Sequence, residues 1–213
     1  LAHELGHAYH HEVLKDAGAI HRSYPMTLAE TASIFSETIV MEEALGSASP
    51  EERLFLVENF LQDSGQVVVD ILSRYLFEKE IFSRRERGDV SPEELGAAML
   101  DAQEKTYGPV LDEKFRHPYM WAVKGHYYRN DLAFYNFPYA FGLLFALGLA
   151  SRCEKEGPAF AAAYRRILAS AGSLSADDTA RLAGFDIGKR EFWRMGIDRI
   201  ARKVEIFEGL VNA

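Results

Sequence analysis

The chain has a single cysteine, Cys153, among its 213 residues. One thiol cannot form an internal disulfide, so the fold does not require an oxidising compartment. Long apolar runs are missing too. The longest, Tyr139–Ala150, has 12 residues and contains two glycines, which makes it too short and too broken to span a bilayer. The sequence therefore predicts a cytoplasmic protein without a membrane partner.

Basic residues are fewer than acidic residues: the chain has 24 lysines and arginines and 32 aspartates and glutamates, which gives a net charge of −8. This acidic balance argues against a nucleic-acid-binding protein and against a basic membrane-surface protein. Hydrophobic residues make up 48% of the chain and aromatic residues 12%, which excludes intrinsic disorder. A chain of this length can bury a hydrophobic core.

Strand patterns are also absent, because no stretch alternates apolar and polar residues between turn signals. Helix signals recur instead. Ser49-Pro50 and Ser91-Pro92 each precede two glutamates, which is typical of a helix start, and Thr27 and Glu30 have the spacing of a capping box. We expect a mainly α-helical single domain with helices over residues 2–17, 27–45, 51–88, 92–107, 139–156, 158–171, 175–183 and 189–211.

Histidines are concentrated at the start of the chain, where five of the seven lie within the first 21 residues. Two of them belong to the segment His3–His7, which has the form H-E-x-x-H. Residues four apart share one face of a helix, so both imidazoles can bind one metal ion. Neutral imidazole is a good zinc ligand, and Glu4 is placed to act as general base toward a water molecule on the zinc. The motif predicts a catalytic zinc site.

Catalytic zinc takes three protein ligands, so a third is needed besides the two histidines. The metzincin pattern requires Gly and His three and six residues after the second histidine, but His10 and Val13 occupy those positions. A di-iron bundle requires a second Glu-x-x-His on another helix, and the sequence contains none. A glutamate from the next helix remains. Position alone leaves four candidates open: Glu30, Glu37, Glu42 and Glu43.

The residues of the motif resemble the zinc helix of the oligoendopeptidase F and thimet oligopeptidase family. In that family the motif is H-E-x-G-H, usually with a further histidine three residues on, and Gly6 and His10 match both features. The resemblance implies a helical zincin-type domain that binds one Zn²⁺ ion. It assigns His3, His7 and Glu30 as the ligands, with Glu37 and His10 as supporting residues around them.

A second match lies in the aromatic segment 125–142, which resembles the family's His- and Tyr-rich substrate loop. There the histidine and tyrosines contact the scissile carbonyl. Peptide hydrolysis forms a tetrahedral oxyanion that needs hydrogen-bond donors, and Tyr O–H and His N–H groups are suitable donors. The resemblance implies catalytic contributions from His126, Tyr128, Tyr135 and Tyr139.

The resemblance as a whole implies a zinc metallopeptidase that cleaves short peptides. Members of the family are much longer, and their N-terminal portion covers the cleft. The chain opens Leu1-Ala2-His3 without an initiator methionine, so we expect residues 1–213 to be the C-terminal catalytic portion of a larger peptidase, with the N-terminal portion as its partner. The alternative is a non-catalytic helical fragment or peptide-binding module whose metal site is incomplete or empty.

Overall fold

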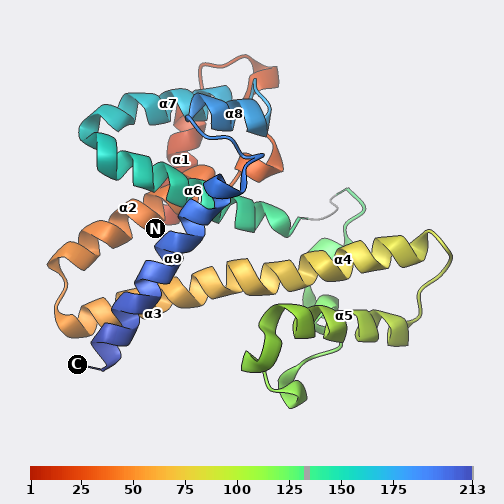
Figure 1. The fold of residues 1–213 in the computed structure, drawn as a ribbon. Coiled ribbons are helices and arrows are strands. Elements are labelled where there is room, and N and C mark those ends of the chain that lie inside the picture. The colour runs from red at the N-terminus through yellow and green to blue at the C-terminus, as the bar shows by residue number, and fades with distance from the viewer. Residues whose placement is uncertain (132–134, 213) are drawn as a thin grey trace. The chain divides into compact units, whose positions relative to one another are not determined.

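The computed structural model describes residues 1–131 and 135–212 (Figure 1). These residues form helices and turns with no β-strand among them, so the predicted mainly α-helical class is confirmed. Among the described helices, none combines the length and the apolar character that a membrane span requires. The α-helices are α1 (Ala2–Leu14), α2 (Thr31–Ser47), α3 (Pro50–Gly65), α4 (Ile71–Arg85), α5 (Pro92–Tyr107), α6 (Phe137–Glu156), α7 (Phe160–Ser170), α8 (Ala176–Leu182) and α9 (Arg190–Val211).

Both Ser-Pro helix starts form as predicted. At the start of α5, the Glu94 amide donates to Ser91 Oγ at 3.3 Å, while the Ser91 amide donates to the Glu94 carboxylate at 2.9 Å. Ser49 and Glu52 exchange the same pair of bonds at the start of α3. The helix expected over 51–88 differs in its middle, where Gln66–Asp70 form a π-helical turn between α3 and α4.

The predicted capping box of Thr27 and Glu30 is wrong. Met26–Leu28 form a short 3₁₀ helix, and α2 begins only at Thr31, with Glu30 as the residue before its first turn. The Glu30 side chain makes no capping hydrogen bond. Its carboxylate is therefore available for another partner. The first helix is also shorter than expected, since α1 ends at Leu14.

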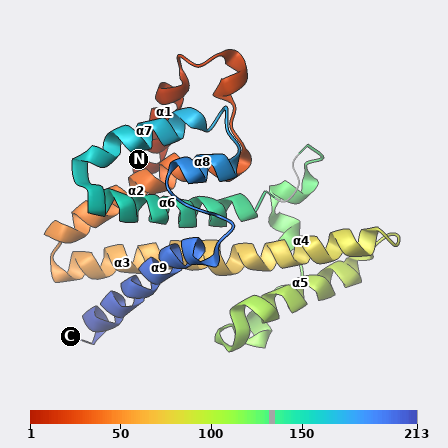
Figure 2. The same ribbon diagram turned by 45° about the horizontal axis from the view of Figure 1, so that its top comes forward.

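The chain divides into two compact units: unit 1 comprises Leu1–Ser64 and Phe141–Ala213, and unit 2 comprises Gly65–Ala140. In unit 1, α1 lies along α2 and also packs against α7 (Figures 1 and 2). Aromatic and aliphatic side chains fill the space between these helices and α6. The most deeply buried members of this core include Leu28, Ala32, Phe145, Leu149, Phe160 and Leu168.

The close approach of α1 to α2 depends on Gly6. A Cβ atom at this position would lie 2.4 Å from the Ala32 carbonyl oxygen and 2.6 Å from Ser33 Cα. Both atoms belong to the backbone, so no side-chain rotation can relieve the overlap. Gly142 on α6 plays the same part, because a Cβ there would lie 2.7 Å from Glu30 Cβ. The two glycines allow α1 and α6 to close around the start of α2.

Unit 2 is built on α4 and α5, which pack side by side. Its small core is formed by Phe77 from α4 and by Ala98, Met99 and Ala102 from α5. Aromatic rings from the turns after α5 cover this core, and Trp121 stacks on Phe77 with ring centroids 6.4 Å apart. The turns that follow α5 are therefore held to α4 by aromatic contacts.

We expect Gly6→Ala to lower the free energy of unfolding by about 1–3 kcal/mol, because the added methyl group must push α1 away from the α2 backbone. Denaturant unfolding followed by circular dichroism measures the change. Gly46→Ala is the matched control, since a Cβ at Gly46 near the end of α2 meets no atom within 4 Å. It should stabilise the helix by about 0.5–1 kcal/mol. Equal stability of Gly6→Ala and the unsubstituted chain would contradict this account.

Candidate metal centre

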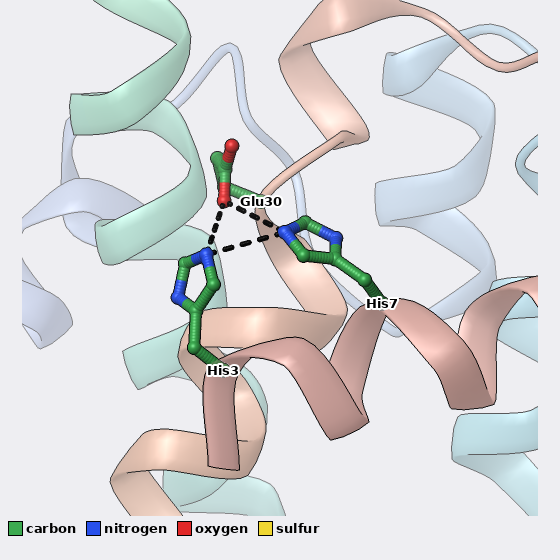
Figure 3. Close-up of side chains that lie close together, drawn as sticks. All are labelled: His3, His7 and Glu30. Carbon is green, nitrogen blue, oxygen red and sulfur yellow. Dashed lines mark hydrogen bonds and ion pairs between the residues drawn. The ribbon is translucent and has the colours of Figure 1, made fainter. Parts of the chain in front are cut away.

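The side chains of His3, His7 and Glu30 converge on one point in unit 1 (Figure 3). Both histidines project from the first two turns of α1, and the carboxylate reaches them from the start of α2. The Nε2 atoms of His3 and His7 lie 3.4 and 3.5 Å from Oε2 of Glu30. The two nitrogens are 3.2 Å apart. Three electron-pair donors thus face one another across a small triangle.

This triangle fits a tetrahedral zinc ion. With ligand bonds of about 2.0–2.1 Å, the donor atoms of a tetrahedral zinc site lie about 3.3 Å from one another. The three observed separations run from 3.2 to 3.5 Å. Two imidazoles and one carboxylate are also a donor set that catalytic zinc sites use, with a fourth position left for water or substrate. The residues present therefore fit the metal.

Glu30 is held in place by its own helix. The hydroxyl of the buried Ser33 donates to Glu30 Oε2 at 2.9 Å, the same oxygen that faces both histidines, and lies 3.0 Å from the Glu30 carbonyl oxygen. The Glu30 side chain is 12% exposed, whereas those of His3 and His7 are 34% and 33% exposed. The centre is thus enclosed on the glutamate side and open to solvent on the histidine side.

Glu37 lies beside the remaining ring nitrogen of His3, with its Oε2 atom 3.3 Å from Nδ1. It is seven residues after Glu30 and so on the same face of α2. A carboxylate that accepts the Nδ1–H of a histidine leaves the Nε2 lone pair for a metal and fixes the orientation of the ring. The contact therefore suits a supporting role for Glu37.

His10 lies on the same side of α1, one turn beyond His7, but it is fully buried. Its ring stacks on Tyr24 at a centroid distance of 4.2 Å, and its Nε2 atom lies 3.3 Å from the Leu168 carbonyl oxygen on α7. Burial lowers the pKa of His10 to about 4, so the ring is neutral. These contacts join α1 to α7 and so fix the helix that carries His3 and His7.

The other residues weighed from the sequence lie elsewhere. Glu42 binds Arg199 at 2.7 Å and Lys203 at 2.9 Å, which ties α2 to α9. Glu43 is exposed on α2. Glu4 follows His3 in the first turn of α1, and its side chain is exposed.

In unit 2, the structure brings together three of the four predicted members of the His- and Tyr-rich segment. The ring of His126 lies 5.4 Å from that of Tyr135 and 6.3 Å from that of Tyr139, and the two tyrosine rings are 5.6 Å apart. We call these three residues the His126 cluster. Tyr128 is different, because its hydroxyl donates to the Ala122 carbonyl oxygen at 2.8 Å. Phe134 of the same segment is outside the described residues.

A buried polar network in unit 2 was not anticipated from the sequence. The Asn136 amide nitrogen donates to Glu78 Oε1 at 2.5 Å, and Arg74 donates to the Asn136 amide oxygen at 3.4 Å. Arg74 also forms an ion pair with Asp70. Asp70, Arg74 and Glu78 follow one another at four-residue intervals along one face of a helix. This spacing of charged residues, on a helix face that also carries apolar residues, is the signal from which the buried network could have been predicted.

Burial raises the pKa of Glu78 to about 7, and the hydrogen bond from Asn136, the nearby Tyr127 hydroxyl and the positive charge of Arg74 oppose this shift without cancelling it. A carboxyl group with such a pKa is close to half protonated at neutral pH.

Comparison with known proteins identifies the family. The description "Peptidase family M3" applies to the family model that matches residues 1–198. The chain belongs to peptidase family M3. The family resemblance inferred from the residues of the first helix is thereby confirmed.

Individual relatives agree with this M3 assignment. The chain is 27% identical to an oligoendopeptidase F homolog from Lactococcus lactis, with 100% of the chain and 35% of that protein covered. It is 27% identical to the group B oligopeptidase PepB of Streptococcus agalactiae, over 90% of the chain and 32% of that protein. The chain therefore spans about a third of the length of these relatives.

Two crystal structures share the fold. A peptidase from Chlamydophila abortus, described as putative, superposes with a TM-score of 0.85 at 25% identity, over 98% of this chain and 35% of that one. Oligoendopeptidase-F from Enterococcus faecium gives a TM-score of 0.79 at 22% identity, over 99% of this chain and 38% of that one. The M3 chain thus has the helical fold of a peptidase segment.

The raised pKa of Glu78 predicts a pH-dependent stability. Because the folded chain keeps a proton that the unfolded chain releases above its ordinary pKa of 4.5, the stabilisation is full below pH 4.5 and is lost as the pH rises through about 7. We expect the free energy of unfolding to fall by up to about 3 kcal/mol over this window relative to Glu78→Gln. Urea unfolding from pH 4.5 to 8 measures it, and parallel curves for the two proteins would contradict it.

Proposed function

We propose that this chain is the zinc-binding catalytic portion of a metalloendopeptidase that hydrolyses peptide bonds in short peptides. The observation that carries the proposal is the triangle of donor atoms from His3, His7 and Glu30, which has the dimensions of a zinc site on a chain of peptidase family M3. When bound there, a zinc ion would polarise the scissile carbonyl and lower the pKa of water from about 15.7 to about 7.

Glu4 is the proposed general base. It sits one residue after the first histidine ligand, in the first turn of α1, and its carboxylate is exposed on a helix whose ligands are themselves one-third exposed. In this role the carboxylate takes a proton from the attacking water and then gives it to the leaving amine. One carboxylate can serve both steps, because the proton that it takes from the water is the proton that the leaving amine requires.

The His126 cluster is the proposed source of donors to the oxyanion. Its members carry one imidazole and two phenol groups, with ring centroids 5.4–6.3 Å apart. Donors fixed before the reaction stabilise developing negative charge without having to reorganise. The Tyr128 hydroxyl donates to the Ala122 carbonyl oxygen, so it would have to give up that bond to act as a donor to the oxyanion.

The names of the relatives support short peptides as the substrate class, since they are called oligoendopeptidases and an oligopeptidase. This chain matches about a third of the length of such proteins, and we infer that the remaining part completes the peptide-binding cleft. The acidic net charge and the single cysteine suit a protein that works in the reducing cytoplasm.

We expect Glu4→Gln to keep one zinc ion and to lose peptide cleavage by about 100-fold or more, because an amide cannot accept the proton. His7→Ala should lose both zinc and cleavage, because two protein ligands remain. Metal analysis of the purified chain and a quenched fluorescent peptide assay measure the two properties. His11→Ala is the matched control, as His11 is an exposed histidine on the same helix; it should change neither.

Two outcomes would overturn the proposal. Cleavage that survives Glu4→Gln would remove Glu4 from its role. A chain that takes up no stoichiometric zinc would instead be a non-catalytic helical module that binds peptides or a partner.

A further inference from the structure

We propose that Glu78 and Arg74, acting through Asn136, position the tyrosines of the His126 cluster. We call these three residues the Asn136 clamp. The inference rests on the proposed function, because it assigns a purpose to the placement of Tyr135 and Tyr139. Every residue of the clamp and of the cluster belongs to unit 2. Glu78 and Arg74 are positioning residues, since their effect on the reaction passes through other side chains.

Both ends of the Asn136 amide are occupied. The side chain is fully buried, its nitrogen donates to Glu78 and its oxygen accepts from Arg74. A flip of the amide would place its NH₂ group against the Arg74 guanidinium, where two donors face each other, so the bond from Arg74 would be lost. Arg74 is fixed in turn by its ion pair with Asp70, which accepts a hydrogen bond from Tyr107 at 3.2 Å. The clamp therefore has one stable arrangement.

Asn136 transmits this arrangement to both tyrosines. It directly follows Tyr135 in the chain, and its carbonyl oxygen accepts a hydrogen bond from the Tyr139 amide at 3.1 Å. The second contact belongs to the turn that leads into α6. A shift of Asn136 therefore moves both rings relative to His126. Displacement of catalytic groups by about 1 Å can reduce a rate about 100-fold.

Glu78 also lies near the stretch that carries His126, since both residues line one pocket. Tyr127, the neighbour of His126, packs edge-on against Phe77 at 5.6 Å and lies beside the Glu78 carboxyl group. Burial raises the pKa of the Tyr127 hydroxyl, and the nearby Glu78 adds to the effect. Glu78 thus bonds the stretch that carries the two tyrosines and lines one pocket with His126 and Tyr127.

Packing alone does not account for the clamp. Burial of a carboxyl group costs free energy, which the raised pKa of Glu78 reflects. Replacement of buried ionic groups by apolar side chains of similar volume is often neutral or stabilising. The directional hydrogen bonds to Asn136 give the buried polar groups a function, the positioning of the two tyrosines, that an apolar side chain could not supply.

Glu78→Leu tests the proposal, because leucine removes the acceptor for Asn136 and leaves no buried charge. We expect kcat for a quenched fluorescent peptide to fall by about tenfold to 100-fold, with KM changed by less than about twofold. Glu78→Gln keeps an oxygen that can accept from Asn136, so it should stay within about twofold of the unsubstituted chain. A chain labelled with 3-fluorotyrosine gives a second readout, as the ¹⁹F resonances of Tyr135 and Tyr139 should shift in Glu78→Leu.

Gln103→Leu is the matched control. Gln103 is a second buried amide of unit 2, and it exchanges two hydrogen bonds of 2.9 Å with the backbone of His117. Its loss removes two hydrogen bonds from a turn outside the cluster, against the one from Asn136 that Glu78→Leu removes, so kcat and both tyrosine resonances should stay unchanged. The resonance of Tyr128, whose hydroxyl is held by Ala122, serves as the internal reference.

The outcomes separate this inference from the proposed function. If the unsubstituted chain cleaves no peptide, the proposed function fails and the ¹⁹F resonances alone decide on the clamp. Unchanged resonances and kcat in Glu78→Leu, or an equal loss of kcat in Gln103→Leu, would overturn the inference. If Glu78→Leu does not fold, the double variant Glu78→Gln with Asn136→Asp reverses donor and acceptor but keeps the bond. Tyrosine resonances at their original positions would then support the clamp, and displaced ones would overturn it.

Discussion

The geometry of the candidate metal centre depends on how closely two helices approach. Gly6 lets the first turns of α1 lie against the backbone of α2, because any side chain there would overlap Ala32 and Ser33. This contact sets the distance between the two histidines, which belong to α1, and Glu30, which precedes α2. The donor atoms end 3.2–3.5 Å apart, and wider helix spacing would leave the carboxylate out of reach. Backbone packing thus fixes the geometry in which a metal could be held.

Residues around this contact fix the orientation of the candidate ligands and the position of α1. Ser33 orients the carboxylate of Glu30, and Glu37 approaches the far nitrogen of His3. His10 anchors the next turn of α1 to α7 through a buried neutral ring. The same principle governs unit 2, where buried polar groups fix the residues next to the proposed oxyanion donors. In both units, a partly exposed group of candidate functional residues lies next to buried polar side chains, His10 in unit 1 and Asn136 in unit 2.

Sequence patterns predicted the helices and the histidine pair because both follow from local periodicity. They could not select the third candidate ligand, since Glu30, Glu37, Glu42 and Glu43 are all compatible with the spacing, and the family resemblance made that choice. The capping rule failed at Glu30 because its carboxylate faces His3 and His7 and makes no capping bond to Thr27. The buried position of the Asn136 clamp could not be predicted from the sequence, because charged residues four apart on a helix usually lie at the surface.

The central claim is that His3, His7 and Glu30 form one zinc site. X-ray absorption at the zinc edge, on the chain loaded with one equivalent of Zn²⁺, tests it directly. The account predicts a four-coordinate ion with two imidazole nitrogens at about 2.0–2.1 Å and oxygen ligands at about 2.0–2.2 Å, and loss of one oxygen ligand from the protein in Glu30→Ala. A spectrum without imidazole scattering, or one that is unchanged by Glu30→Ala, would contradict it.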